Sequence, residues 1–163
     1  MKILISISSP EYYRNYITSP ALNELNGRRI FLVPEALSNK EFPVADKGQI
    51  VVYNYPKDKE ILHKHLFHID TGKFESRSTS LAFRFMRLSK RSQIMYRLLG
   101  APIIYPLIRL AILRRARDKD LESRIKNIRP DIILLPSSGY EGLTFEIIKI
   151  AAKNKIPTLM LVD

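Results

Sequence analysis

The chain has 163 residues, of which 45% are hydrophobic and 26% charged, which is the composition of a globular domain and excludes a disordered chain. It contains no cysteine, which excludes disulfides and thiolate metal sites and fits a reducing, cytoplasmic environment. The formal net charge of +11 favours an anionic partner.

Three short apolar runs in the first third of the chain predict buried strands. They are Ile3–Ile7, Ile30–Val33 and Ile50–Tyr53. Ser19 followed by Pro20 predicts the start of a short helix between the first two strands, because serine is a favoured N-cap and proline a favoured first helical residue. Residues 58–67 predict a second helix.

The middle of the chain, residues 78–128, has a helical and basic pattern. Gly100, Pro102 and Pro106 interrupt it, because proline breaks or kinks a helix. Residues 114–128 then predict one charged amphipathic helix that ends before Pro130.

The last third predicts two further strands, at 131–135 and 158–162, separated by a loop at 137–142 and a helix at 143–154. Continuous apolar strands that alternate with helices are typical of a parallel sheet covered on both faces. We therefore expect a single Rossmann-like, doubly wound α/β domain over residues 1–163, with about five strands in the order 3-2-1-4-5. The basic helical insert would occupy about 73–130.

In that order the first and fourth strands are neighbours at the topological switch point, where this fold class binds ligands. The loops that follow them supply the candidate substrate-binding residues. Small residues before a helix suit phosphate or a sugar hydroxyl, although Ser138 and Glu141 equally form a capping box. The candidates are Ser8, Ser9, Ser137, Ser138, Gly139 and Tyr140.

Three carboxylates near this crevice are candidate general bases: Glu11, Glu141 and Asp163, each of which is otherwise a solvated surface group. The sequence has no G-x-G-x-x-G and no Walker motif, so dinucleotide and NTPase functions have no support. His63, His65 and His68 lack the i, i+4 spacing of zinc ligands, and we expect surface or partly packed histidines without a metal.

The positive charge is concentrated in one segment. Residues 73–130 hold 15 of the 27 Lys and Arg but only four of the 16 acidic residues. Residues 98–108 carry no charge, and an apolar stretch flanked by arginines fits a membrane interface. The alternative is that this stretch faces a protein core and the arginines face water. The expected membrane contacts are Arg84, Arg87, Arg91, Arg97 and Arg109. Nucleic acid ranks below a membrane because no RRM, KH or helix-turn-helix pattern is present.

Residues 130–142 and 157–163, together with the opening Met1–Ser6, resemble the N-terminal domain of GT-B-type glycosyltransferases, particularly bacterial ones that build surface polysaccharide. The resemblance implies an acceptor-side half that associates peripherally with the inner face of the membrane and meets a lipid-linked or saccharide acceptor. The nucleotide-sugar donor would be bound by a C-terminal domain that is absent here, so this part alone would not catalyse. Because the last predicted strand ends at the last residues, we expect the natural polypeptide to continue.

A second hypothesis is a non-catalytic module or subunit that recognises a phosphorylated ligand or a partner chain. It differs from the first in needing no donor domain.

Overall fold

The computed structural model describes residues 1–163 except 19, 23, 39–47, 74–76, 137–140 and 162–163. Its contacts divide the chain into two compact units. The α/β unit comprises Met1–Pro56 and Asp118–Asp163, and the helical unit comprises Lys57–Arg117.

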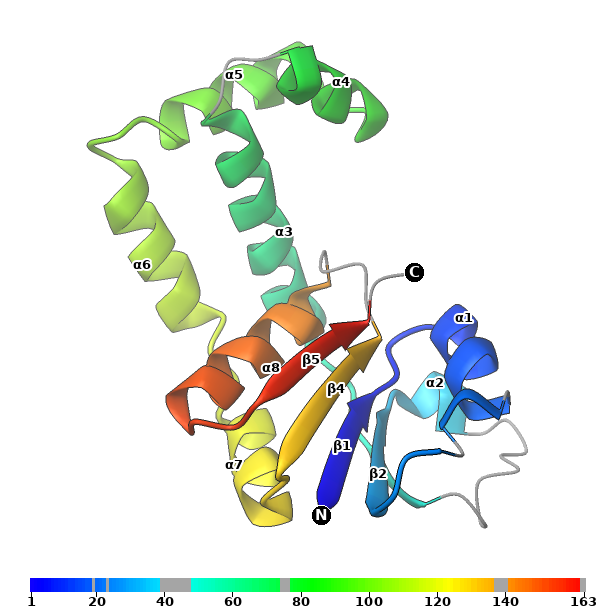
Figure 1. The fold of residues 1–163 in the computed structure, drawn as a ribbon. Coiled ribbons are helices and arrows are strands. Elements are labelled where there is room, and N and C mark those ends of the chain that lie inside the picture. The colour runs from blue at the N-terminus through cyan, green and yellow to red at the C-terminus, as the bar shows by residue number, and fades with distance from the viewer. Residues whose placement is uncertain (19, 23, 39–47, 74–76, 137–140, 162–163) are drawn as a thin grey trace. The chain divides into compact units, whose positions relative to one another are not determined.

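The α/β unit is built on a five-stranded, all-parallel sheet in the order β3-β2-β1-β4-β5, which confirms the predicted fold class and strand order (Figure 1). Leu4 in the central strand lies opposite Ile30 on one side and Ile133 on the other, so both neighbours pair with β1. The strands are β1 (Lys2–Ser6), β2 (Arg28–Val33), β3 (Gln49–Val52), β4 (Ile132–Pro136) and β5 (Thr158–Leu161).

One face of the sheet is covered by α7 (Lys119–Ile128) and α8 (Gly142–Lys153). Successive strand residues point to opposite faces, so Leu4 and Ile133 face these helices. They pack there with residues at helical spacing, and the fully buried members include Leu121, Ile125 and Ile147.

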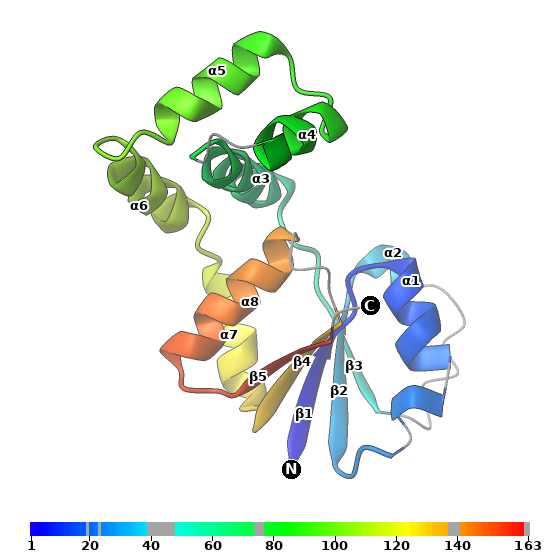
Figure 2. The same cartoon turned by 45° about the horizontal axis from the view of Figure 1, so that its top comes forward.

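The opposite face is covered by α1 (Pro10–Tyr12), a π-helical turn (Tyr13–Thr18), a 3-10 turn (Pro20–Leu22) and α2 (Glu35–Ser38), as Figure 2 shows. The 3-10 turn Pro20–Leu22 stands where a short helix was expected after Ser19, a residue that lies outside the described part of the chain. Ile3, Ile5 and Phe31 of the sheet pack with Tyr13 and Leu22. The sheet is therefore doubly wound.

The single helix expected over 114–128 is two helices, α6 (Tyr105–Arg115) and α7. The break falls at Asp118, whose carboxylate caps α7 by accepting the N–H groups of Asp120 and Leu121 at 3.0 and 3.1 Å. Because α7 is packed in the sheet core, it belongs to the α/β unit. The helical insert therefore spans Lys57–Arg117 instead of the expected 73–130.

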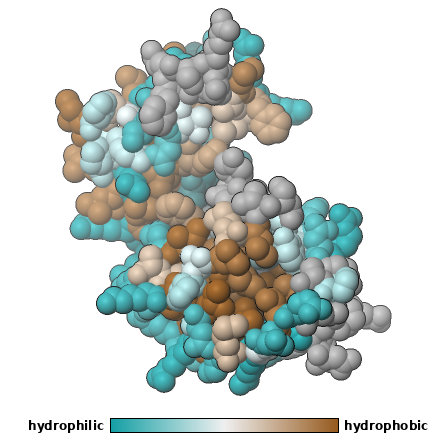
Figure 3. Space-filling model, in the orientation of Figure 1, coloured by the Kyte–Doolittle hydropathy of each residue, from teal (hydrophilic) through white to brown (hydrophobic). Residues whose placement is uncertain are grey.

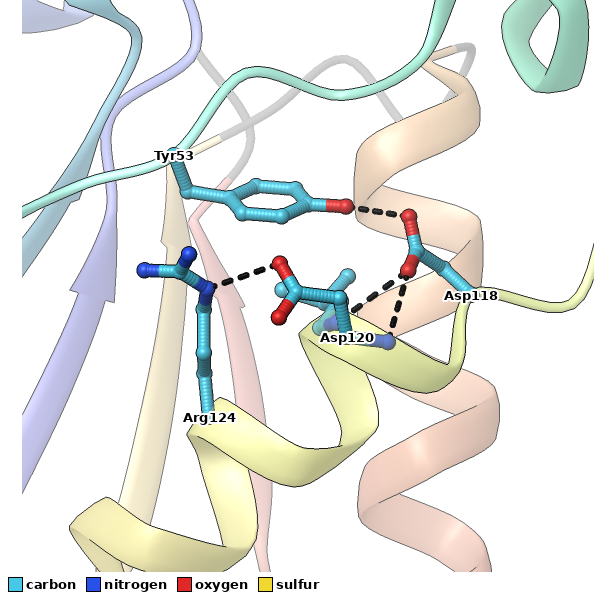
Figure 4. A network of polar contacts seen from close by, with 5 residues as sticks. Tyr53, Asp118, Asp120 and Arg124 are labelled. Carbon is cyan, nitrogen blue, oxygen red and sulfur yellow. Dashed lines mark hydrogen bonds and ion pairs between the residues drawn. The ribbon is translucent and has the colours of Figure 1, made fainter.

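A buried polar network surrounds Asp118 (Figure 4). Tyr53 donates its hydroxyl hydrogen bond to the Asp118 carboxylate, and the Glu146 carboxylate accepts the backbone N–H of Asp118 at 3.1 Å. Burial, reinforced by the bond to Asp118, raises the pKa of Tyr53. Arg124 pairs with Asp120 at 2.8 Å on the exposed side of the same network. The hydrogen bond from Tyr53 therefore joins the end of β3 to the start of α7.

We expect Tyr53→Phe to lower the free energy of unfolding of the α/β unit by about 1–3 kcal/mol, because Asp118 stays buried after losing a hydrogen-bond donor. Arg124→Ala is the control, since it removes the exposed ion pair with Asp120 and a cation 5.6 Å from the centre of the Tyr53 ring, and should change stability by about 1 kcal/mol or less. Urea unfolding of both variants measures the difference. Equal effects would show that the buried hydrogen bond contributes no more than the exposed pair.

Candidate functional site

The carboxyl edge of the sheet is the first candidate, because β1 and β4 lie side by side where the strand order reverses. Here α8 begins at Gly142 with Glu141 in the N-cap position, and the Glu141 side chain makes no capping hydrogen bond. Glu141 is therefore not inside the first turn, where the expected capping box places it. Ser137, Ser138, Gly139 and Tyr140 lie outside the described residues.

The other candidate residues at this edge differ in their position and burial. Ser9 is the N-cap of α1, where its hydroxyl accepts the N–H of Tyr12 at 3.3 Å. Glu11 is exposed in the first turn of α1. Glu141 is half-buried and accepts a long hydrogen bond, 3.4 Å, from the Thr144 hydroxyl. Asp163 lies outside the described residues.

Among the described residues, the hydroxyls of Ser6 and Ser8 at this edge are buried without a hydrogen-bond partner. Ser6 is 2% exposed and lies two residues after Leu4, so strand alternation directs it toward the face covered by α8. A buried hydroxyl without a partner costs about 1–3 kcal/mol. Ser8 was predicted from the sequence, whereas Ser6 was not. The signal for Ser6 was a serine at the end of an otherwise Ile/Leu strand.

We expect Ser6→Ala to raise the free energy of unfolding by about 1 kcal/mol, because it removes a buried hydroxyl that makes no hydrogen bond. Ser9→Ala is the matched control and should lower it by about 0.5–2 kcal/mol, because that hydroxyl caps α1. Denaturant titration of the two variants compares them. A destabilised Ser6→Ala protein would mean that the Ser6 hydroxyl has a partner in solution.

The second candidate is the helical unit, formed by α3 (Lys57–Gly72), α4 (Arg77–Phe85), α5 (Lys90–Leu99) and α6. Its core cluster is small, with Ile69, Phe83 and Tyr96 as the buried members. Gly72 lets α3 approach α5 closely, because a Cβ there would lie 3.0 Å from the carbonyl oxygen of Tyr96.

Polar contacts add to this small core. Tyr105 of α6 donates a hydrogen bond to Asp70 of α3, and the Lys73 ammonium lies 3.6 Å from the centre of the Tyr105 ring. The hydroxyl of Tyr96 lies 2.8 Å from Nδ1 of His65. Burial, followed by the bond to Asp70, raises the pKa of Tyr105. These contacts fasten α5 and α6 to α3.

The face of the helical unit drawn in Figure 3 carries both hydrophilic and hydrophobic residues. Lys57–Arg117 contains fourteen Lys and Arg against four Asp and Glu. All five arginines expected at a membrane are exposed, as are Lys90, Arg114, Arg115 and Arg117. Among described residues, ten large apolar side chains of this unit are exposed: Ile61, Leu81, Phe85, Ile94, Met95, Leu98, Ile103, Ile104, Leu107 and Leu110.

Two of the three histidines are core residues of the helical unit instead of surface groups. His63 is 7% exposed and His68 is 4% exposed, and the His68 ring packs on Tyr96 with centroids 5.1 Å apart. No cluster of three or more potential metal ligands occurs among the described residues. Within the same part of the chain, no helix has the length and apolar character needed to cross a bilayer.

Comparison with known proteins gave no match to a protein-family model, to a curated protein or to a solved structure. The function is therefore inferred from the fold, the carboxyl edge of the sheet and the surface of the helical unit.

We expect the helical unit to lose stability as the pH falls below about 6.5, the ordinary pKa of histidine. Burial, followed by the nearby Lys64 and His65, lowers the pKa of His68, so the unfolded chain binds the proton more readily than the folded one. Thermal unfolding at about pH 7.5 and about pH 5.5 should show a drop in Tm that shrinks in His68→Phe. An undiminished drop in that variant would assign the acid sensitivity to another group.

Proposed function

We propose that this chain is the acceptor-side domain of a nucleotide-sugar-dependent glycosyltransferase for surface polysaccharide, and that its helical unit docks on the anionic inner face of a membrane. The observation that carries the proposal is a combination of two features of the described part of the helical unit. Ten large apolar side chains are exposed between Ile61 and Leu110, and nine cations are exposed between Arg84 and Arg117. Monomeric proteins rarely expose large apolar surface, and such surfaces mark membrane or protein contacts.

The distribution of charge favours an anionic membrane as the partner of the helical unit. The helical unit carries a net charge of about +10, while the rest of the chain is close to neutral, with thirteen basic and twelve acidic residues. Each Lys or Arg near an anionic leaflet contributes about 1 kcal/mol. If five of the nine exposed cations face lipid, about 5 kcal/mol is available, which is enough for reversible peripheral binding.

The α/β unit would hold the acceptor. Its switch-point edge offers the hydroxyls of Ser6 and Ser8, which are polar groups that can meet sugar hydroxyls. The donor nucleotide-sugar would be held by a second domain or a partner subunit. Leu159 and Met160 on the edge strand β5 are 49% and 38% exposed and offer an apolar surface for such a partner. Catalysis then belongs to the assembled enzyme, not to this chain alone.

A second candidate is a non-catalytic module that recognises a phosphorylated ligand. The position of the β1–β4 switch point favours it, because ligands of doubly wound folds bind at that edge of the sheet. This candidate requires the same edge of the sheet and no donor domain.

We expect the chain to pellet with vesicles that contain phosphatidylglycerol and not with purely zwitterionic vesicles. The triple variant Arg91→Glu, Arg97→Glu and Arg109→Glu should bind at least about a hundredfold more weakly, because three favourable charges become repulsive.

The control for this experiment carries Arg14→Glu, Lys119→Glu and Lys155→Glu, which are exposed positions of the α/β unit with the same change in net charge. It should bind nearly as well as the wild type. Equal loss in both variants would show that only net charge matters, and absence of binding at low salt would contradict membrane docking.

A further inference from the structure

The α5–α6 corner, residues 98–110, is the most apolar exposed part of the helical unit. Residues 98–108 of this corner contain no charged side chain. Gly100 ends α5, and the turn that follows is closed by the bond from the Tyr105 N–H to the Ala101 carbonyl at 2.9 Å. Ile103 at the tip of the turn is 87% exposed. The corner is therefore a defined turn with an isoleucine projecting into solvent.

The outward faces of both helices continue this apolar surface. Ile94 and Leu98 lie four residues apart on α5 and are 59% and 63% exposed. Leu107 and Leu110 lie three apart on α6 and are 70% and 48% exposed. The inward positions are apolar as well, since Leu99, Tyr105, Ile108 and Ile112 pack against the core cluster. Packing within the helical unit thus explains only one of the two apolar faces.

Cations border the apolar tip. Arg97 precedes the charge-free segment, Arg109 follows it, and Arg91, Arg114 and Arg115 extend the basic border along α5 and α6. All five are exposed. An apolar tip surrounded by long cationic side chains complements the boundary between acyl chains and anionic headgroups, because the alkyl stems pack on the apolar region while the guanidinium groups reach the phosphates.

We propose that the α5–α6 corner inserts into the acyl layer of an anionic leaflet, with Arg97 and Arg109 at the level of the lipid phosphates. This inference rests on the proposed function and identifies the part of the helical unit that enters the lipid. Docking then combines charge attraction with burial of Ile103 and Leu107, and the second contribution is insensitive to salt.

The absence of tryptophan from the chain gives a direct test. Ile103→Trp places a single reporter at the tip, and Ile61→Trp places the same reporter at a 54% exposed isoleucine near the start of α3. The corner packs at the other end of α3, where Gly100 lies beside Ile69 and Lys73. That separation is about 12–18 Å along the helix.

With vesicles of phosphatidylcholine and phosphatidylglycerol, the tryptophan emission of the Ile103→Trp protein should shift to the blue and be quenched by lipids brominated on their acyl chains. The tryptophan emission of the Ile61→Trp protein should change little.

A second experiment uses the original chain without a tryptophan reporter. There, the double substitution Ile103→Ser with Leu107→Ser should weaken vesicle binding at about 0.5 M salt by at least about tenfold. Both side chains are exposed, so circular dichroism should be unchanged.

The outcomes separate this inference from the proposed function. A protein that pellets with vesicles without quenching at position 103, or with equal quenching at positions 61 and 103, overturns insertion of the corner and leaves docking in place. A blue shift without quenching by brominated chains assigns the corner to a protein contact and also overturns insertion. A protein that fails to pellet at all contradicts the proposed function itself.

Discussion

The hydrogen bond from Tyr53 to Asp118 joins the two points at which the chain leaves and re-enters the α/β unit. Tyr53 directly follows β3, and Asp118 is the N-cap of α7, which packs on the sheet and leads into β4. Holding together the ends of a long insertion restricts the freedom of the chain, which is the entropic part of loop closure. The same Asp118 carboxylate also caps α7. One buried residue therefore stabilises the start of the crossover helix and holds together the two ends of the insertion.

This constraint explains why a basic segment of sequence divides between two units. The connection from β3 to β4 must pass over the sheet and place a helix on its face, as parallel strands require. The helix that does so is α7, with Leu121 and Ile125 fully buried against the sheet. The residues before Asp118 are free of this requirement and form a helical unit with its own core. The excess positive charge therefore lies in the helical unit, while the α/β unit, which includes α7, is close to neutral.

The strands and their order could be predicted because each is a continuous Ile/Leu/Val run, and few connections are compatible with a parallel sheet. The break between α6 and α7 was missed because helical periodicity continues across it. Its signal was present in Asp118 followed by Asp120 and Glu122, which is an N-cap with acidic residues in the first turn. The turns on the opposite face were missed because short π and 3-10 stretches have no periodic pattern to detect.

The candidate surfaces could be predicted only in part. The sequence identifies the arginines and the charge-free segment, but it leaves open whether Leu98 and Leu107 face a core or water. Only the packing of α3, α5 and α6 separates the inward Ile108 and Ile112 from the outward Leu107 and Leu110. Ser6 was missed for a related reason, since the absence of a hydrogen-bond partner is a property of its surroundings.

The helical unit combines a small core with a large exposed apolar surface. Both features lower the stability that it gains from its own packing. Among the described residues, three form its buried hydrophobic cluster and six partly buried ones pack against it, while ten large apolar side chains face outward. Burial of apolar area is the main favourable contribution to folding, so a unit with this distribution draws little stability from its own interior. Contact with a lipid surface would remove part of the outward area from water and add to the free energy that holds α5 and α6 against α3. Docking and the order of the helical unit would then be thermodynamically linked, with each favouring the other.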